Sequence, residues 1–112
     1  MVEIFKALAE ESRLRILSIL LENDMCVCEI ENCLGLKQSN ISRHLSALKS
    51  CKILDNYKKA QWSYYKINPD FIEQNQKFWL YLEEKLKELP SFEEDYKRMK
   101  KCKSENICNC LI

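Results

Sequence analysis

The sequence predicts one mainly α domain that carries a single small β-hairpin. Its 112 residues are the size of one domain, and one Gly and two Pro are too few turn-forming residues for a sandwich or barrel of many short strands. Apolar residues recur at helical spacing along most of the chain, and an aromatic-rich stretch over residues 52–68 interrupts them once. A chain this small buries a core of modest stability, so we expect it to form a dimer.

The N-terminal part of the chain predicts two helices within residues 2–22. Apolar positions follow helical spacing first around Leu8 and then again from Leu14 to Leu21. Ser12 is the expected N-cap of the second helix, because a Ser side chain accepts a hydrogen bond from a free N–H at a helix start.

The next segment predicts two helices joined by a tight corner. Residues 26–34 are expected to form a short helix, and Gly35, the only glycine, supplies the left-handed conformation that such a corner requires. A second helix is expected over residues 38–50. Its core-facing stripe consists of Ile41, Leu45 and Leu48.

Residues 52–68 predict the β-hairpin. Its polar tip, Lys58-Lys59-Ala60-Gln61, lacks the Asn-Gly or Asp-Gly pair of a two-residue turn, so we expect a longer loop there. One long amphipathic helix is then expected to run from Pro69 to Leu89, where Pro90 interrupts it.

The C-terminal end predicts a last short helix and a tail. Ser91 and Glu94 have the spacing of a capping box for a helix that continues to about Lys101. Beyond it the sequence shows no periodicity, so we expect one folded domain over residues 1–101 and a flexible, Cys-containing tail over residues 102–112.

Charge is unevenly distributed along the chain. Residues 36–66 contain seven basic side chains and one acidic one, a balance of +6, whereas the net charge of the whole chain is +1. A basic segment in an otherwise acidic protein is typical of proteins that bind a phosphate backbone. No apolar run approaches the roughly 20 residues needed to cross a bilayer, and the first residues are not those of a secretory signal, so we expect a cytoplasmic protein without membrane contact.

Cysteine is unusually frequent. Seven Cys is an odd number, so disulfides within one chain would leave a thiol over. In a reducing compartment, thiols are more often metal ligands or redox-active groups than structural bridges. They lie at Cys26, Cys28, Cys33, Cys51, Cys102, Cys108 and Cys110.

The order of the predicted elements is that of a winged helix-turn-helix, and several segments resemble the ArsR-type family of metalloregulatory repressors. The segment Cys26-Val27-Cys28-Glu29-Ile30 is similar to that family's metal box. The resemblance covers roughly residues 2–75, and its other segments are Phe5-Lys6-Ala7-Leu8-Ala9, Ser12-Arg13-Leu14-Arg15-Ile16-Leu17, Ser39-Asn40-Ile41-Ser42-Arg43-His44-Leu45 and Tyr64-Tyr65-Lys66-Ile67. The resemblance implies a homodimer, paired through its first and long C-terminal helices, that represses an operator and releases it when a soft metal or metalloid binds thiolates.

Cys26, Cys28 and Cys33 are the main candidate ligands. On an ideal helix Cys26 and Cys28 point about 160° apart and Cys33 lies about 10 Å from Cys26 along the axis, so one ion can bind only if the first turn unwinds or other ligands join. In the arsenic sensors that the box most resembles, a third Cys stands where this chain has Glu31. The additional candidates are Cys102, Cys108 and Cys110.

An all-thiolate site selects soft ions. Arsenic(III) or antimony(III) is the preferred interpretation, and cadmium, lead and zinc stay open. Three-sulfur coordination of arsenite suits a chain with a single His, which does not favour a mixed His and carboxylate zinc site. Arsenite or antimonite is therefore the expected inducer.

The candidate DNA-contacting residues lie on the second helix of the helix-turn-helix and on the hairpin. The first turns of such a helix contact base edges in the major groove, and basic residues of the wing contact phosphates. In a twofold dimer, two such helices predict a palindromic operator of double-stranded DNA. The candidates are Gln38, Ser39, Asn40, Ser42, Arg43 and His44 on the helix and Lys58, Lys59 and Gln61 on the wing.

Other functions compete with this interpretation. An enzyme is disfavoured, because the sequence has no Gly-rich phosphate loop and no His besides His44 to act as a base for a Cys nucleophile. A redox-sensing repressor stays open, since the same cysteines are oxidisable. A metal sensor responds to its ion under reductant, whereas a redox sensor responds only to an oxidant.

Overall fold

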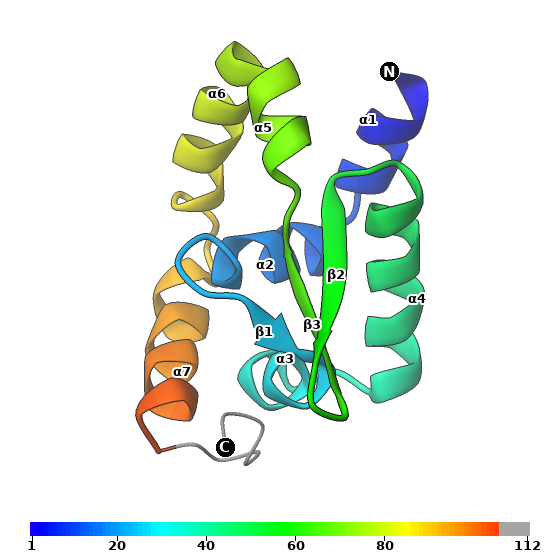
Figure 1. Ribbon diagram of the computed structural model, residues 1–112. Coiled ribbons are helices and arrows are strands. Elements are labelled where there is room, and N and C mark those ends of the chain that lie inside the picture. The colour runs from blue at the N-terminus through cyan, green and yellow to red at the C-terminus, as the bar shows by residue number, and fades with distance from the viewer. Residues whose placement is uncertain (106–112) are drawn as a thin grey trace.

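The structure is a computed structural model, and it describes residues 1–105. These residues form seven helices and three strands (Figure 1). In chain order the elements are α1 (Val2–Leu8), α2 (Glu11–Ile19), β1 (Met25–Cys26), α3 (Val27–Leu34), α4 (Gln38–Ser50), β2 (Leu54–Lys59), β3 (Trp62–Ile67), α5 (Pro69–Gln74), α6 (Gln76–Leu86) and α7 (Phe92–Glu105). The mainly helical fold with a small sheet that the sequence predicts is therefore confirmed.

The helix-turn-helix consists of α3 and α4. Gly35 follows α3 in the left-handed conformation, with φ of +66°, and its N–H donates to the Glu31 carbonyl, as the sequence predicts. The predicted bounds of α4 are confirmed, and its apolar stripe is fully buried. That stripe packs with residues of α2 and α3 in the main core, which includes Ile16, Leu17, Ile30, Ile41, Leu45 and Leu48.

The wing differs from the prediction in two respects. Its sheet has three antiparallel strands in the order β1-β3-β2, because the short strand β1 pairs with β3 through Met25 and Tyr65 and through Cys26 and Tyr64. The loop between β2 and β3 is a two-residue turn, since Lys59 pairs directly with Trp62, so the expected longer loop is wrong. Ala60 makes this tight turn with φ of +58°, a conformation that usually belongs to glycine.

The helices differ from the prediction at their ends. Glu10, not Ser12, is the N-cap of α2. The long helix expected from Pro69 breaks at Asn75, whose side chain donates to the Phe71 carbonyl at 3.0 Å and so closes α5 before α6 begins. The predicted capping box at Ser91 does not form in residues 1–105, where the buried Ser91 hydroxyl has no hydrogen-bond partner.

The last helix, α7, runs through Glu105, beyond the end predicted near Lys101. It lies against α2 and α3 (Figure 1), so Cys102 is part of a packed helix and not of a flexible tail. Cys108 and Cys110 lie outside the described residues. Within residues 1–105, no helix is both long and apolar enough to cross a membrane.

Candidate functional site

The exposed face of α4 carries most of the predicted DNA-contacting side chains. Arg43 is the longest of them; its guanidinium lies 4.0 Å from the Glu10 carboxylate, and its side chain stays 60% exposed. An exposed polar face at the start of this helix can reach base edges in a major groove. The other exposed side chains of the face are Gln38, Ser39, Asn40 and Ser42.

His44 does not belong to this face, although the sequence places it among the candidate DNA-contacting residues. Its side chain is 3% exposed, and Nδ1 accepts a hydrogen bond from Arg13 Nε at 3.1 Å while Nε2 lies 3.4 Å from Glu10 Oε1. Burial lowers the pKa of His44, and the Arg43 and Arg13 charges lower it further against the opposing effect of Glu10. His44 therefore acts as a neutral link that fixes α4 against α2.

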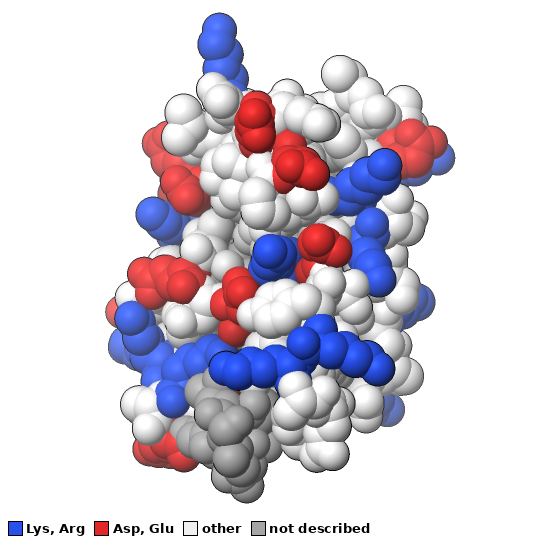
Figure 2. Space-filling view, viewed as in Figure 1, with Lys and Arg blue, Asp and Glu red and all other residues white. Residues whose placement is uncertain are grey.

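The wing presents its basic side chains to solvent. Lys58 and Lys59 at the end of β2 and Gln61 in the turn are all exposed. On the face seen in Figure 2, basic side chains form a band that crosses the lower half of the molecule, over α7 and the wing. This placement suits contacts with a phosphate backbone.

Cys26 occupies the junction of the sheet and α3. Its backbone is extended, with φ of −85° and ψ of 167°; its sulfur accepts from the N–H of Glu29, and its own N–H donates to Glu29 Oε1 at 3.0 Å. It is buried against Tyr64 of β3, next to the half-buried Cys28 of the first turn. Because Cys26 lies outside the helix, the separation of Cys26 and Cys28 on an ideal helix does not apply.

Glu29 and Lys103 complete this junction, and the sequence analysis missed both. Lys103 Nζ of α7 lies 3.1 Å from the buried Glu29 Oε1 and donates to the Asp24 carbonyl at 2.8 Å. The same ammonium group lies 6.0 Å from the centre of the Tyr64 ring. The position of Glu29 three residues after an N-cap was a usable signal, but the sequence gives none for the partner 74 residues away.

Cys33 and Cys102 face each other between α3 and α7. Both are free thiols with 1% exposure. Burial raises the pKa of Cys33 to about 12, and the neighbouring Cys102 thiol adds to that increase. Burial also raises the pKa of Cys102. Both thiols are therefore protonated at neutral pH.

The described cysteines thus do not converge on one preformed site. Residues 1–105 contain no cluster of three or more Cys, His, Asp or Glu side chains arranged to hold a metal ion. Cys26 and Cys28 lie beside the wing strand, whereas Cys33 belongs to the main core. Cys51 is half-buried at the end of α4, and its thiol donates to the Leu48 carbonyl.

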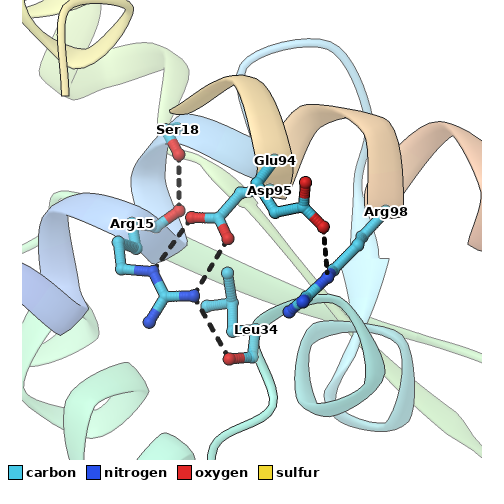
Figure 3. Close-up of polar contacts among 6 residues, drawn as sticks. All are labelled: Arg15, Ser18, Leu34, Glu94, Asp95 and Arg98. Atoms are coloured by element: carbon cyan, nitrogen blue, oxygen red, sulfur yellow. Dashed lines mark hydrogen bonds and ion pairs between the residues drawn. The ribbon is translucent and has the colours of Figure 1, made fainter. Parts of the chain in front are cut away.

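A buried ion pair links α7 to the helix-turn-helix (Figure 3). Arg15 of α2 donates to Asp95 of α7 through Nε and Nη2, both at 2.9 Å, and Nη2 also donates to the Leu34 carbonyl at 3.2 Å. The hydrogen bonds to Asp95 raise the pKa of Arg15 above its ordinary value. Leu34 is the last residue of α3, so this contact fixes the corner next to Gly35 from the α7 side.

An apolar face remains exposed on α1 and α6. Phe5 packs edge to face against Phe78 with ring centres 5.7 Å apart, yet about half of its side chain is exposed. Phe5 and Phe78 also line a hollow with Met1, Ile4 and Asn75. The other large exposed apolar side chains are Met1, which precedes α1, Val2 in α1, and Leu80 and Tyr81 in α6.

Comparison with known proteins agrees with this geometry. A family model described as bacterial regulatory protein, arsR family, matches residues 10–55. The arsenic resistance transcriptional regulator ArsR1 of Pseudomonas putida is 44% identical over 68 residues, which are 60% of this chain and 53% of the relative, so the match spans about half of that protein.

Two solved structures share the fold. Reduced HlyU from Vibrio cholerae has a TM-score of 0.58 and 34% identity, over 69% of this chain and 85% of that one. A homodimeric winged helix-turn-helix DNA-binding domain from Mycobacterium bovis has a TM-score of 0.63 and 26% identity, over 72% of this chain and 75% of that one. With its winged helix-turn-helix, its exposed α4 face and these matches, the chain belongs to the arsR family of DNA-binding transcriptional regulators.

Proposed function

We propose that this chain is a homodimeric repressor that leaves a palindromic operator when a thiophilic metal(loid), arsenite or antimonite, binds to Cys26 and to Cys28, whose disulfide must first be reduced. The proposal has three parts: DNA contact by α4 and the wing, pairing of two chains, and a thiol site that opposes DNA binding. Each part rests on a different surface of the molecule.

DNA contact is assigned to the exposed face of α4 and to the wing. Arg43 suits a guanine edge and Asn40 or Gln38 an adenine edge, each worth about 1–3 kcal/mol of discrimination when both hydrogen bonds form. Lys58, Lys59 and Gln61 contribute contacts to the backbone. His44 is left out of this set, because it is buried against α2.

Pairing of two chains is assigned to the exposed apolar face of α1 and α6. An isolated small domain rarely leaves a contiguous patch of large apolar side chains in water. Covering Phe5 and the hollow that it lines with Phe78 by the same face of a second copy gives a twofold dimer, and a twofold dimer binds a palindromic site.

The position of Cys26 is the observation that carries the inducer site. Its sulfur caps α3, its N–H binds Glu29, and its backbone pairs with Tyr64 of the wing. An ion that takes the sulfur removes the capping interaction, which costs about 0.5–2 kcal/mol at a typical helix N-cap. A coupling of about 1–3 kcal/mol is enough to lower operator affinity 5–150-fold.

The remaining thiolate of a three-sulfur site is assigned to one of the other candidate cysteines. Cys33 and Cys102 are buried in the main core, and Cys108 and Cys110 follow α7 in sequence. Soft-ion chemistry leaves cadmium, lead and zinc as alternatives to arsenite. Titration of the DNA-bound protein with each ion distinguishes among these ions, and cysteine variants distinguish among these ligands.

The test measures release of DNA by each ion. A fluorescent duplex that the protein selects from a random library is titrated to saturation, and arsenite, antimonite, cadmium or zinc is then added. The reductant is a phosphine, because a dithiol reductant chelates arsenite. Arsenite should lower the anisotropy with wild type and with the control Cys51→Ser, but not with Cys26→Ser/Cys28→Ser.

Two results would contradict the proposal. DNA that stays bound at every ion concentration excludes metal(loid) sensing, and release by peroxide alone in the absence of phosphine then supports the redox-sensing repressor. Arsenite release that persists in the Cys26→Ser/Cys28→Ser protein moves the inducer site to other cysteines.

A further inference from the structure

One carboxylate lies between the start of α2 and the exposed face of α4. Glu10 is the N-cap residue of α2, yet its side chain makes no capping hydrogen bond to that helix. Its two oxygens instead face three basic side chains: Oε2 lies 3.4 Å from Arg13, and Oε1 lies 3.4 Å from His44 and 4.0 Å from Arg43. The carboxylate is therefore directed at α4 and not at the N–H groups of its own helix.

Arg13 and His44 hold this carboxylate in place. Arg13 Nε donates to His44 Nδ1 at 3.1 Å, so the neutral ring carries its proton on Nε2, which faces Glu10 Oε1. The side chains of Arg13 and His44 are only 14% and 3% exposed, so both oxygens of Glu10 rest against groups with little freedom to move. Glu10 thus presents a fixed negative charge at the edge of the DNA-contacting face.

We propose that Glu10 is a positioning residue that determines the sequence specificity of DNA binding through Arg43. The inference rests on the proposed function, in which Arg43 contacts a guanine edge. The Arg43 side chain is 60% exposed, so its guanidinium is able to reach DNA. A guanidinium has five N–H donors, so one can stay with Glu10 while two others bind a base. Holding the group from one side also leaves it fewer orientations to lose when it binds.

The charge of Glu10 also acts against nonspecific binding. A carboxylate is repelled by a phosphate backbone, and beside Arg43 it offsets the attraction of that guanidinium for any phosphate within reach. This penalty is the same for every DNA sequence, but only a site that offers Arg43 a base edge compensates for it. Glu10 therefore lowers the affinity for random DNA and favours the correct base.

The test compares the affinities for a selected duplex and for a random duplex, measured by fluorescence anisotropy under a phosphine reductant. Glu10→Gln keeps the size of the side chain and one acceptor oxygen, but removes the charge. It should tighten binding to the random duplex and make the slope of log affinity against log salt concentration more negative by about 1. The ratio of selected to random affinity should fall about fivefold or more, as expected when a bidentate base contact is lost.

Glu11→Gln is the matched control. Glu11 is the next residue, it is exposed, and it is also acidic in the first turn of α2. Its substitution changes the net charge by the same amount, so it should leave the affinity ratio unchanged. Equal effects of Glu10→Gln and Glu11→Gln on both duplexes would overturn the proposal, because they would reflect net charge alone.

A double-mutant cycle tests whether Glu10 acts through Arg43. In the Arg43→Ala protein, Glu10→Gln should no longer change the affinity ratio, because the side chain that Glu10 positions is absent. Additive effects of the two substitutions would overturn the proposal. Urea unfolding of each variant detects a merely structural role, in which Glu10→Gln lowers stability and weakens binding to both duplexes alike; that result would also overturn it.

The outcomes separate the inference from the proposed function. If Arg43→Ala lowers the affinity ratio and Glu10→Gln does not, the base contact stands and the positioning role is overturned. If Arg43→Ala weakens binding to both duplexes alike, the base contact of the proposed function is overturned, and the positioning role with it.

Discussion

Replacing Asp95 with Ala should destabilise the protein far more than replacing its neighbour Glu94, although both residues make an ion pair. The Asp95 side chain is 2% exposed and forms two hydrogen bonds of 2.9 Å to Arg15. The Glu94 side chain is 64% exposed and lies 3.2 Å from Arg98 one turn away on the same helix. Figure 3 shows the two pairs side by side.

The magnitude follows from burial. Removing one partner of a buried pair leaves a charge without compensation and costs about 3–5 kcal/mol. The Arg15 side chain is 19% exposed and keeps its bond to the Leu34 carbonyl, so we expect a value near the lower limit, about 3 kcal/mol. The exposed pair at Glu94 contributes about 0.3–0.5 kcal/mol, as helical pairs of this spacing do.

Urea unfolding followed by circular dichroism measures both values. A domain of this size has about 5–15 kcal/mol of total stability, so Asp95→Ala should shift the midpoint clearly while Glu94→Ala should barely move it. The double variant Arg15→Met/Asp95→Leu should recover most of the loss, because it removes both charges. Equal costs for Asp95→Ala and Glu94→Ala would refute the assignment of α7 as a helix held by a buried ion pair.

Three further predictions test other parts of the molecule. Ala60→Gly should stabilise the wing turn by up to about 1 kcal/mol in the same urea assay, because Ala60 has φ of +58° and glycine has no penalty there; a loss of stability would contradict this. Burial lowers the pKa of His44 beside Glu10, Arg13 and Arg43, so the unfolded chain binds a proton that the native state does not. Stability should therefore fall as the pH drops below about 6.5, and His44→Asn should reduce that dependence in urea titrations at several pH values. In anisotropy titrations, Arg43→Ala should weaken binding to a selected operator more than binding to a random duplex, and equal effects on both duplexes would exclude base contact. Lys58→Ala should weaken binding to both duplexes alike, and it should lower the slope of log affinity against log salt concentration by about 1.

The parts of the fold that follow from neighbouring residues were predictable from sequence. The bounds of α4 and the left-handed corner at Gly35 depend on local periodicity and on one residue without a Cβ, and both are confirmed. The two-residue turn of the wing was not predictable from turn preferences, because Ala60 adopts a conformation that the pairing of β2 with β3 imposes. Tertiary contacts overrode the local signal there.

The burial of His44 has the same kind of cause. On a helical wheel it is polar and adjoins the exposed positions of α4, so sequence reasoning placed it outward. Its two ring nitrogens instead face Arg13 and Glu10, which lie 31 and 34 residues earlier in the chain. A polar side chain can be buried when another element supplies its hydrogen bonds, and a single sequence does not show which element does so.

The thiol sites show where residue spacing stops being informative. On one ideal helix the side chains of Cys26 and Cys28 point too far apart to bind one ion. That prediction holds only if Cys26 belongs to the helix. Pairing of Cys26 with Tyr64, 38 residues away, draws it into the sheet and makes it the cap of α3. Under the proposed function, an ion bound at Cys26 acts on β3 through the pairing with Tyr64 and on α3 through its N-cap, so a single ligand reaches both the wing and the helix that precedes α4.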